Sequence, residues 1–119
     1  MDVLKSLQAE LSAFAADRDW EQFHSPKNLA MALSVEAGEL LERFQWLSPE
    51  QSERAALSSS ALHGVEEEMA DVLLYLLRLA DRLDVDLAAV AAAKLQKNAE
   101  KYPVEKAKGN AVKYSRRGE

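Results

Sequence analysis

The 119-residue sequence contains no cysteine, which excludes disulfide-stapled scaffolds, thiolate nucleophiles and cysteine-based zinc or iron–sulfur sites. Its four glycines and three prolines are too few for a protein built from many short strands and turns. Alanine, leucine, glutamate and the basic residues, which favour helices, are abundant instead. We therefore expect one all-α domain, because a chain of this length has too few residues to close a second core.

Long hydrophobic runs are also missing. The two longest, 72–77 and 87–93, fall far short of the roughly 18 apolar residues that a membrane-spanning helix needs. The first residues include Asp2, Lys5 and Glu10, and so lack the continuous apolar stretch of a secretory signal. Together with the absence of cysteine, these features predict a cytoplasmic protein.

Positive charge is scarce in most of the chain. Residues 1–100 hold 9 Lys and Arg against 18 Asp and Glu, while residues 101–119 hold 6 against 2. Proteins bind nucleic-acid polymers through many contacts from Lys and Arg to phosphates, so the acidic body argues against such a partner. A small phosphorylated ligand carried by a metal ion is compatible with this charge.

Hydrophobic periodicity and capping residues predict four main helices, over residues 2–18, 26–46, 62–83 and 87–102. Ser25 before Pro26 is a typical helix start, and Pro103 disfavours helix at the residue before it. The connector from Ser48 is expected to form a short helix or structured loop that ends at the serines 58–60. The expected division is a four- to five-helix domain over residues 1–103 and a polar, basic arm over residues 104–119.

Two pairs of carboxylates stand at helical spacing. Glu36 and Glu39 form E-x-x-E in the second expected helix, and Glu68 and Asp71 form E-x-x-D in the third. Residues three apart on a helix are neighbours, and at about 100° per residue both pairs lie to the same side of their apolar stripes. If the two helices pack antiparallel, which the connector favours, the four carboxylates converge on one groove.

Converging carboxylates repel one another unless cations neutralise them, and all-oxygen ligands favour Mg²⁺ or Mn²⁺. A di-iron site is less compatible, because helical di-iron bundles use an E-x-x-H motif on each of two helices. Only His24 follows a glutamate, Glu21, at that spacing, and His63 does not. Spacing alone leaves an alternative equally open. The pairs could be solvated acidic faces that form salt bridges with nearby arginines: Arg43, Arg78 or Arg82.

Polar residues interrupt the apolar face of the fourth expected helix. Lys94, Asn98 and Tyr102 follow Leu87 and Ala91 at four-residue intervals. Such breaks in pattern are where functional sites occur, and these side chains could offer a charge to phosphate, a two-way hydrogen bond and a ring or hydroxyl. Alternatively, the helix leaves the core here and Lys94 keeps its charge in solvent.

Aromatic residues flank the second expected helix. Trp20, Phe23 and Trp46 could sandwich a base, and His24 could form a hydrogen bond to its edge. Aromatic residues at helix ends also serve as plugs of the core, and the sequence does not separate these two roles.

The motifs together resemble a known family. The run N-L-A-M-A-L-S-V-E-A-G-E-L-L-E-R-F-Q-W, at 28–46, and the run E-E-M-A-D-V-L-L-Y-L, at 67–76, are similar to the MazG-like all-α nucleoside triphosphate pyrophosphohydrolases. D-W-E-Q-F-H-S-P-K-N-L, at 19–29, and the K-x-x-x-N-x-x-x-Y-P pattern ending at Pro103 resemble the dCTP pyrophosphatase branch. The resemblance covers about residues 10–103.

The resemblance implies a MazG-like bundle whose core and active site are completed by oligomerisation, as a tetramer built from dimers. It implies Mg²⁺, with Mn²⁺ as a substitute, on Glu36, Glu39, Glu68 and Asp71. It also implies the following substrate contacts: Trp20, His24, Lys27, Asn28 and Trp46 around the base, and Lys94, Asn98, Lys101 and Tyr102 near the phosphates or sugar.

These features predict Mg²⁺-dependent hydrolysis of a deoxynucleoside triphosphate, dCTP or a 5-modified analogue, to the monophosphate and pyrophosphate, for sanitation of the nucleotide pool. Glu39 is the candidate to deprotonate the attacking water. No Ser-His-Asp set, Walker loop or G-x-G-x-x-G is present to support covalent or P-loop chemistry. The alternatives are a broad or dUTP-preferring pyrophosphatase, or a helical interaction module without catalysis.

Overall fold

The computed structural model describes residues 2–113 and residue 115, and every regular element in these residues is helical. They belong to two compact units, Met1–Val85 and Asp86–Glu119. The first contains α1 (Val3–Asp17), α2 (Pro26–Glu42) and α3 (Ser59–Arg82). Three short 3₁₀ turns, Glu21–Phe23, Glu50–Ser52 and Arg54–Ala56, lie between these helices. The expected all-α fold is confirmed.

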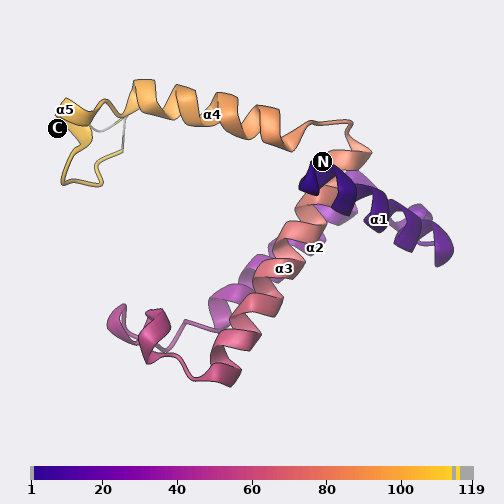
Figure 1. Cartoon of the computed structure of the whole chain (residues 1–119), viewed down its shortest axis with the longest axis horizontal. Coiled ribbons are helices and arrows are strands. Elements are labelled where there is room, and N and C mark those ends of the chain that lie inside the picture. The colour runs from indigo at the N-terminus through magenta and orange to yellow at the C-terminus, as the bar shows by residue number, and fades with distance from the viewer. Residues whose placement is uncertain (1, 114, 116–119) are drawn as a thin grey trace. The chain divides into compact units, whose positions relative to one another are not determined.

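Helices α2 and α3 form the closely packed centre of the first unit (Figure 1). They run antiparallel, because the start of α2 contacts the end of α3 through His24 and Arg78, and the end of α2 contacts the first half of α3 through Arg43 and Glu68. The side chains of Leu29 on α2 and Leu77 on α3 are fully buried. The predicted antiparallel pair is therefore present.

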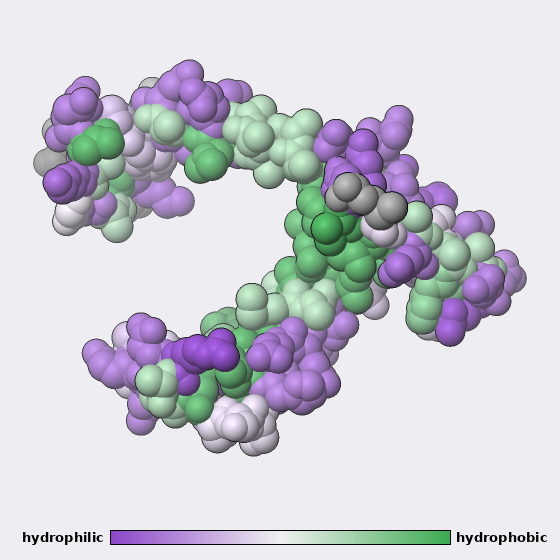
Figure 2. Space-filling view, in the orientation of Figure 1, coloured by the Kyte–Doolittle hydropathy of each residue, from purple (hydrophilic) through white to green (hydrophobic). Residues whose placement is uncertain are grey.

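Helix α1 completes the core by packing against α3. Its Ala15 is 1% exposed, and the Gln8 side-chain amide donates a hydrogen bond of 3.0 Å to the backbone carbonyl of Leu77. In Figure 2 hydrophobic surface continues along much of α3. Part of the apolar side of this helix is thus covered by α1 and α2, while another part lies at the surface.

The predicted helix starts are formed by the expected side chains. The Ser25 hydroxyl accepts from the backbone N–H of Asn28 at 3.1 Å, and Pro26 occupies the first turn, where its missing N–H is not needed. Asp2 and Asp86 cap α1 and α4 in the same way. These starts were predictable because each depends on residues within one turn of the chain.

After each of two helices, a residue other than glycine adopts the left-handed backbone conformation. Asp19 after α1 and Asp84 after α3 both have φ of 55°. In the residue that follows each of them, the backbone N–H closes a hydrogen bond to the helix: Trp20 donates to the carbonyl of Ala15, and Val85 donates to the carbonyl of Ala80. This hydrogen-bond pattern closes the last turn of a helix, and at α1 it fixes where Trp20 leaves the helix.

Two helix boundaries differ clearly from the sequence expectation. Helix α2 ends at Glu42 rather than near Trp46, and residues 43–46 continue as turns. Helix α3 begins at Ser59 rather than at residue 62, because the Ser58 hydroxyl accepts from the N–H of Ala61 at 3.2 Å and starts the helix. The serines 58–60 were expected to end the connector, but they start α3.

The second unit contains α4 (Leu87–Lys101) and the one-turn helix α5 (Val104–Ala107). Helix α4 ends next to Pro103, as expected. Of the predicted basic arm, residues 114 and 116–119 lie outside the described residues. No helix of the described chain is long and apolar enough to span a membrane.

Candidate metal centre and adjoining cavity

Three carboxylates meet between α2 and α3. One oxygen from each of Glu36, Glu39 and Glu68 lies within 4.8 Å of the others, and all three residues are half-buried. Helix α2 supplies Glu36 and Glu39, which are three residues apart and therefore neighbours on one face of the helix. Helix α3 supplies Glu68. We call these three residues the carboxylate cluster.

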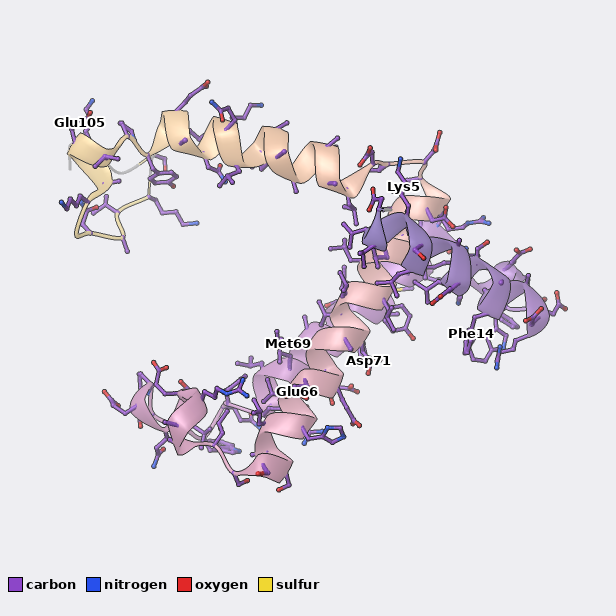
Figure 3. All side chains as sticks on the ribbon, viewed as in Figure 1. Lys5, Phe14, Glu66, Met69, Asp71 and Glu105 are labelled. Carbon is purple, nitrogen blue, oxygen red and sulfur yellow. The ribbon has the colours of Figure 1, made fainter. Side chains whose placement is uncertain are left out.

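Asp71, the fourth predicted ligand, is exposed and lies outside this group of three. It follows Glu68 by one turn of α3, and its charge is among those that raise the pKa of Glu36. Figure 3 labels Asp71 and Met69 on α3; two residues apart on a helix, they lie on nearly opposite faces. Asp71 therefore lies beside the carboxylate cluster and also lines the cavity described below.

Burial, together with the hydrogen bond and the charge of Glu39, raises the pKa of Glu36 to about 7. The charges of Asp71 and Glu68 act in the same direction. A carboxyl group among other carboxylates keeps its proton because neighbouring negative charges cannot all be formed at low cost. Without a cation, Glu36 therefore keeps its proton to a higher pH than an isolated glutamate does.

Two oxygens of the carboxylate cluster lack protein partners. Glu36 Oε2 and Glu68 Oε2 are buried and have no hydrogen-bond partner. Buried polar atoms are normally satisfied, and carboxylate oxygens without donors are suitable ligands for a hard divalent cation. The donor set therefore fits a divalent metal ion.

One arginine of the alternative salt-bridge interpretation does contact the cluster. Arg43 Nη2 lies 3.3 Å from Glu68 Oε1, and its guanidinium occupies the space above Gly64, where a Cβ atom would come within 2.6 Å of Arg43 Nη1. Arg78 pairs with Asp81. A salt bridge thus occupies one oxygen of Glu68, while its other oxygen is left for the cluster.

A cavity of about 460 Å³ lies between α1, α3 and the two residues that flank the first 3₁₀ turn. It is of a size that holds small-molecule ligands. Asp71 lies in its wall together with Trp20 and His24, two of the residues expected around a base. The remaining lining residues are Leu7, Glu10, Leu11, Phe14, Leu74, Tyr75 and Arg78.

His24 is held by contacts on two sides. Its Nδ1 accepts a hydrogen bond of 3.1 Å from Arg78 Nε, and its ring lies edge to face with Trp20 at 6.4 Å between centroids. Trp20 makes a similar contact with Phe14, at 5.6 Å. Burial lowers the pKa of His24, and the positive charges of Arg78 and Arg82 lower it further. These contacts place a neutral imidazole in the cavity wall.

The other predicted base contacts lie at the two ends of α2. Asn28 uses its side-chain amide to donate to the carbonyl of Phe23 at 3.1 Å, and Lys27 next to it is exposed. Trp46 is 86% exposed and is not among the residues that line the cavity. The structure therefore brings Trp20 and His24 together and does not place Trp46 in the same cavity.

The predicted phosphate and sugar contacts belong to the second unit. Lys94 is exposed, while Asn98 and Lys101 are half-buried on α4. Tyr102 is half-buried at the end of this helix, where its backbone N–H donates to the carbonyl of Asn98 at 2.9 Å. Asn98 and Tyr102 thus share one side of the last turn.

Sequence reasoning missed Tyr75 and Arg78 as cavity residues, and with them the side chains that α1 contributes. Tyr75 and Arg78 follow Asp71 by four and seven residues, which is one face of a helix, so extending the spacing from Asp71 could have found them. The contribution of α1 depends on tertiary packing, and no local pattern signals it.

A model of the MazG-like family matches residues 31–116, which includes both carboxylate pairs. The chain belongs to the MazG-like family. This family assignment agrees with the all-helical fold and with the E-x-x-E and E-x-x-D motifs on α2 and α3.

Named relatives of this MazG-like chain are similar over nearly its whole length. dCTP pyrophosphatase 1 of Rattus norvegicus is 44% identical and that of Homo sapiens 41% identical, each over 97% of this chain. The chain spans 66% of the length of these curated relatives. The crystal structure of a pyrophosphatase from Archaeoglobus fulgidus has a TM-score of 0.79 and 40% identity, and the match covers 87% of this chain and 94% of that one.

Proposed function

We propose that this protein is a nucleoside triphosphate pyrophosphohydrolase that converts dCTP, or a 5-modified dCTP, to the monophosphate and pyrophosphate. The observation that carries the proposal is the position of Asp71, which lies beside the carboxylate cluster and also lines the cavity. One ligand could therefore place phosphates at the cluster and a base in the cavity. The identity to proteins named dCTP pyrophosphatase 1 supports the choice of base.

Glu36, Glu39, Glu68 and Asp71 are the residues that would hold the metal, and Mg²⁺ is the proposed ion with Mn²⁺ as a substitute. Bound metal supplies neutralisation of the triphosphate charge and orientation of a water for attack. The unpartnered oxygens of Glu36 and Glu68 support this assignment. In the second unit, Lys94, Asn98, Lys101 and Tyr102 are proposed to contact the phosphates or sugar, and Lys27 and Asn28 to lie near the base.

Glu39 is proposed to take a proton from the attacking water. The water oxygen forms a bond to the α-phosphorus, the bond from that phosphorus to the bridging oxygen of the β-phosphate breaks, and pyrophosphate leaves. Glu39 is half-buried within the carboxylate cluster, so its carboxylate can lie beside a water oriented there and accept the proton that the water releases.

The test is pyrophosphate release from a panel of canonical and modified deoxynucleoside triphosphates with Mg²⁺. Glu39→Gln should abolish turnover and leave the helical circular dichroism spectrum unchanged. Glu42→Gln is the matched control, because it makes the same charge change on the same helix at an exposed position outside the cluster. Full activity in Glu39→Gln would overturn the role given to this residue.

Metal binding can be tested without substrate. Because a cation would bind the folded cluster and not the unfolded chain, millimolar Mg²⁺ should raise the Tm of the wild type by mass action. Glu36→Gln should remove most of this shift. A Tm that does not respond to Mg²⁺ or Mn²⁺ would contradict the metal site and favour an interaction module whose acidic groove binds a basic partner.

The proposal also includes a cytoplasmic location and a homo-oligomer, a tetramer built from dimers. Large apolar side chains at the surface of the first unit support self-association: Met31, Val35 and Leu41 on α2, and Met69 and Leu73 on α3. Apolar surface of this kind is characteristic of interfaces between subunits.

A further inference from the structure

Arg78 is a charged residue inside the first unit, where it is 5% exposed. Its Nε donates to His24 Nδ1 at 3.1 Å, and its Nη1 lies 3.2 Å from Asp81 Oδ2. A buried guanidinium is costly unless it is paired and hydrogen-bonded. The two contacts hold the guanidinium between Asp81 on α3 and His24 at the end of the first 3₁₀ turn, in the wall of the cavity.

The hydrogen bond from Arg78 determines which nitrogen of His24 carries a proton. Arginine only donates hydrogen bonds, so Nδ1 of His24 must be the acceptor and cannot carry a hydrogen. A neutral imidazole has one N–H, which is therefore at Nε2. Protonation would place an N–H of His24 against an N–H of Arg78, in agreement with the lowered pKa of His24.

We propose that Arg78 is a positioning residue that holds His24 as a hydrogen-bond donor at Nε2 and thereby selects a base with an acceptor at ring position N3. This inference rests on the proposed function, which places a pyrimidine base in this cavity. Cytosine has an acceptor at N3, whereas uracil and thymine have an N–H there. The N–H at Nε2 can donate a hydrogen bond to N3 of cytosine. With uracil or thymine, the same N–H would face the N3–H of the base, and neither group could accept.

Without Arg78, the imidazole would be free to carry its proton on Nδ1 and to accept at Nε2. It could then pair with the N3–H of uracil or thymine. The contribution of Arg78 is to exclude this second tautomer. Selection by a polar group that the wrong ligand leaves unpaired is stronger than selection by apolar contact.

The tautomer can be measured in the protein without metal or nucleotide. NMR correlation of the ring nitrogens with the ring carbon-bound protons, in histidine labelled with ¹⁵N, distinguishes an acceptor nitrogen from an N–H nitrogen. The chain has two histidines, and the exposed His63 is the internal reference. We expect His24 to show an acceptor at Nδ1 and an N–H at Nε2 at neutral pH. The opposite tautomer, or a charged ring, would overturn the proposal.

Three variants distinguish the effect of the hydrogen bond from Arg78 to His24 from the effect of positive charge near His24. Arg78→Met fills similar volume without a donor and should let both tautomers appear, whereas Arg78→Lys keeps a charged donor and should retain the Nε2–H form. Arg82→Gln is the matched control, because Arg82 acts on His24 by charge alone and lies on the same helix. If Arg82→Gln frees the tautomer as Arg78→Met does, charge rather than the hydrogen bond is responsible and the proposal is wrong.

Selection is then measured as the ratio of kcat/KM for dCTP to that for dUTP. Arg78→Met should lower this ratio about tenfold, which is near the upper value for loss of one neutral hydrogen bond, and Arg78→Lys should restore part of it. The same ratio is taken from the Kd values of dCMP and dUMP, which need no catalysis. An unchanged ratio in both measurements would overturn the role of Arg78. If no triphosphate is hydrolysed, the proposed function fails, while the NMR and monophosphate results still decide the proposal.

Discussion

Folding lowers the pKa of His24, and this makes the free energy of unfolding depend on pH with a definite sign. Its pKa is lowered from 6.5 by burial and by Arg78 and Arg82, with Glu21 opposing them. As pH falls below 6.5, the unfolded chain binds a proton that the folded state resists, so the contribution of His24 to stability is lost in this range. The free energy of unfolding, from urea titrations at pH 7.5 and 5.5, should therefore fall less in His24→Gln than in the wild type.

The same experiment has an internal check in Arg82. Arg82→Gln removes one of the charges that lower the pKa of His24 and should weaken the pH dependence without abolishing it. A His24→Gln variant with the full pH dependence of the wild type would show that other groups cause it.

At the residue scale the two cavity residues that flank the base are expected to differ in effect. Stacking on an aromatic ring is worth roughly 1–3 kcal/mol and tolerates any base, whereas hydrogen bonds distinguish bases. Trp20→Ala should therefore raise KM for all accepted triphosphates together, and His24→Ala should narrow the gap between dCTP and its competitors. The measurement is kcat/KM for dCTP, dUTP and dTTP in both variants. If Trp20→Ala reorders the three substrates and His24→Ala does not, the roles are reversed.

At the element scale, the ion pair between Arg43 after α2 and Glu68 on α3 uses the space left by the missing side chain of Gly64. A Cβ atom there would come within 2.6 Å of the Arg43 guanidinium, which is the far end of a flexible side chain and 43% exposed. In Gly64→Ala we expect Arg43 to move away from Glu68. The gain of about 1 kcal/mol from replacing glycine in a helix should then be offset by the lost contact.

A double-mutant cycle isolates this coupling. In an Arg43→Ala background the three atoms nearest to the new methyl group are removed, so Gly64→Ala should raise the free energy of unfolding by about 1 kcal/mol there and by less in the wild type. Urea titrations of the four proteins give the difference. Equal effects in both backgrounds would mean that Arg43 does not occupy the space above Gly64.

The elements also show which parts of the structure the sequence predicts. The starts of α1, α2 and α4 were predictable because a cap such as Ser25 or Asp86 acts within one turn. The end of α2 at Glu42 was not, because the apolar spacing continues to Trp46 while the backbone changes to turns.

The convergence of Glu36, Glu39 and Glu68 followed from offsets around two antiparallel helices. The cavity could not be predicted, since α1 packs against α3 by contacts far apart in sequence, such as Gln8 with Leu77.

At the scale of the whole molecule, the first unit buries few side chains and leaves many large apolar ones at its surface. Met69 on α3 is 57% exposed and Val35 on α2 is 60% exposed, although both belong to the two central helices. Soluble monomers rarely expose so much apolar surface in one region, whereas subunit interfaces are rich in it. This surface supports the proposed homo-oligomer, in which a second copy would cover α2 and α3.

Charged residues at this surface should dissociate the oligomer. We expect Val35→Asp with Leu73→Glu to lower the molar mass measured by light scattering after size exclusion, because an unpaired charge in an interface is costly to desolvate. The control is Val3→Glu, which adds a charge at a 69% exposed position on α1, outside the central pair. The dissociated variant should also have a lower Tm that no longer rises with protein concentration, since association stabilises the folded state by mass action. A wild type that already has the mass of one chain would contradict the oligomer, and its exposed apolar surface would then need a different partner.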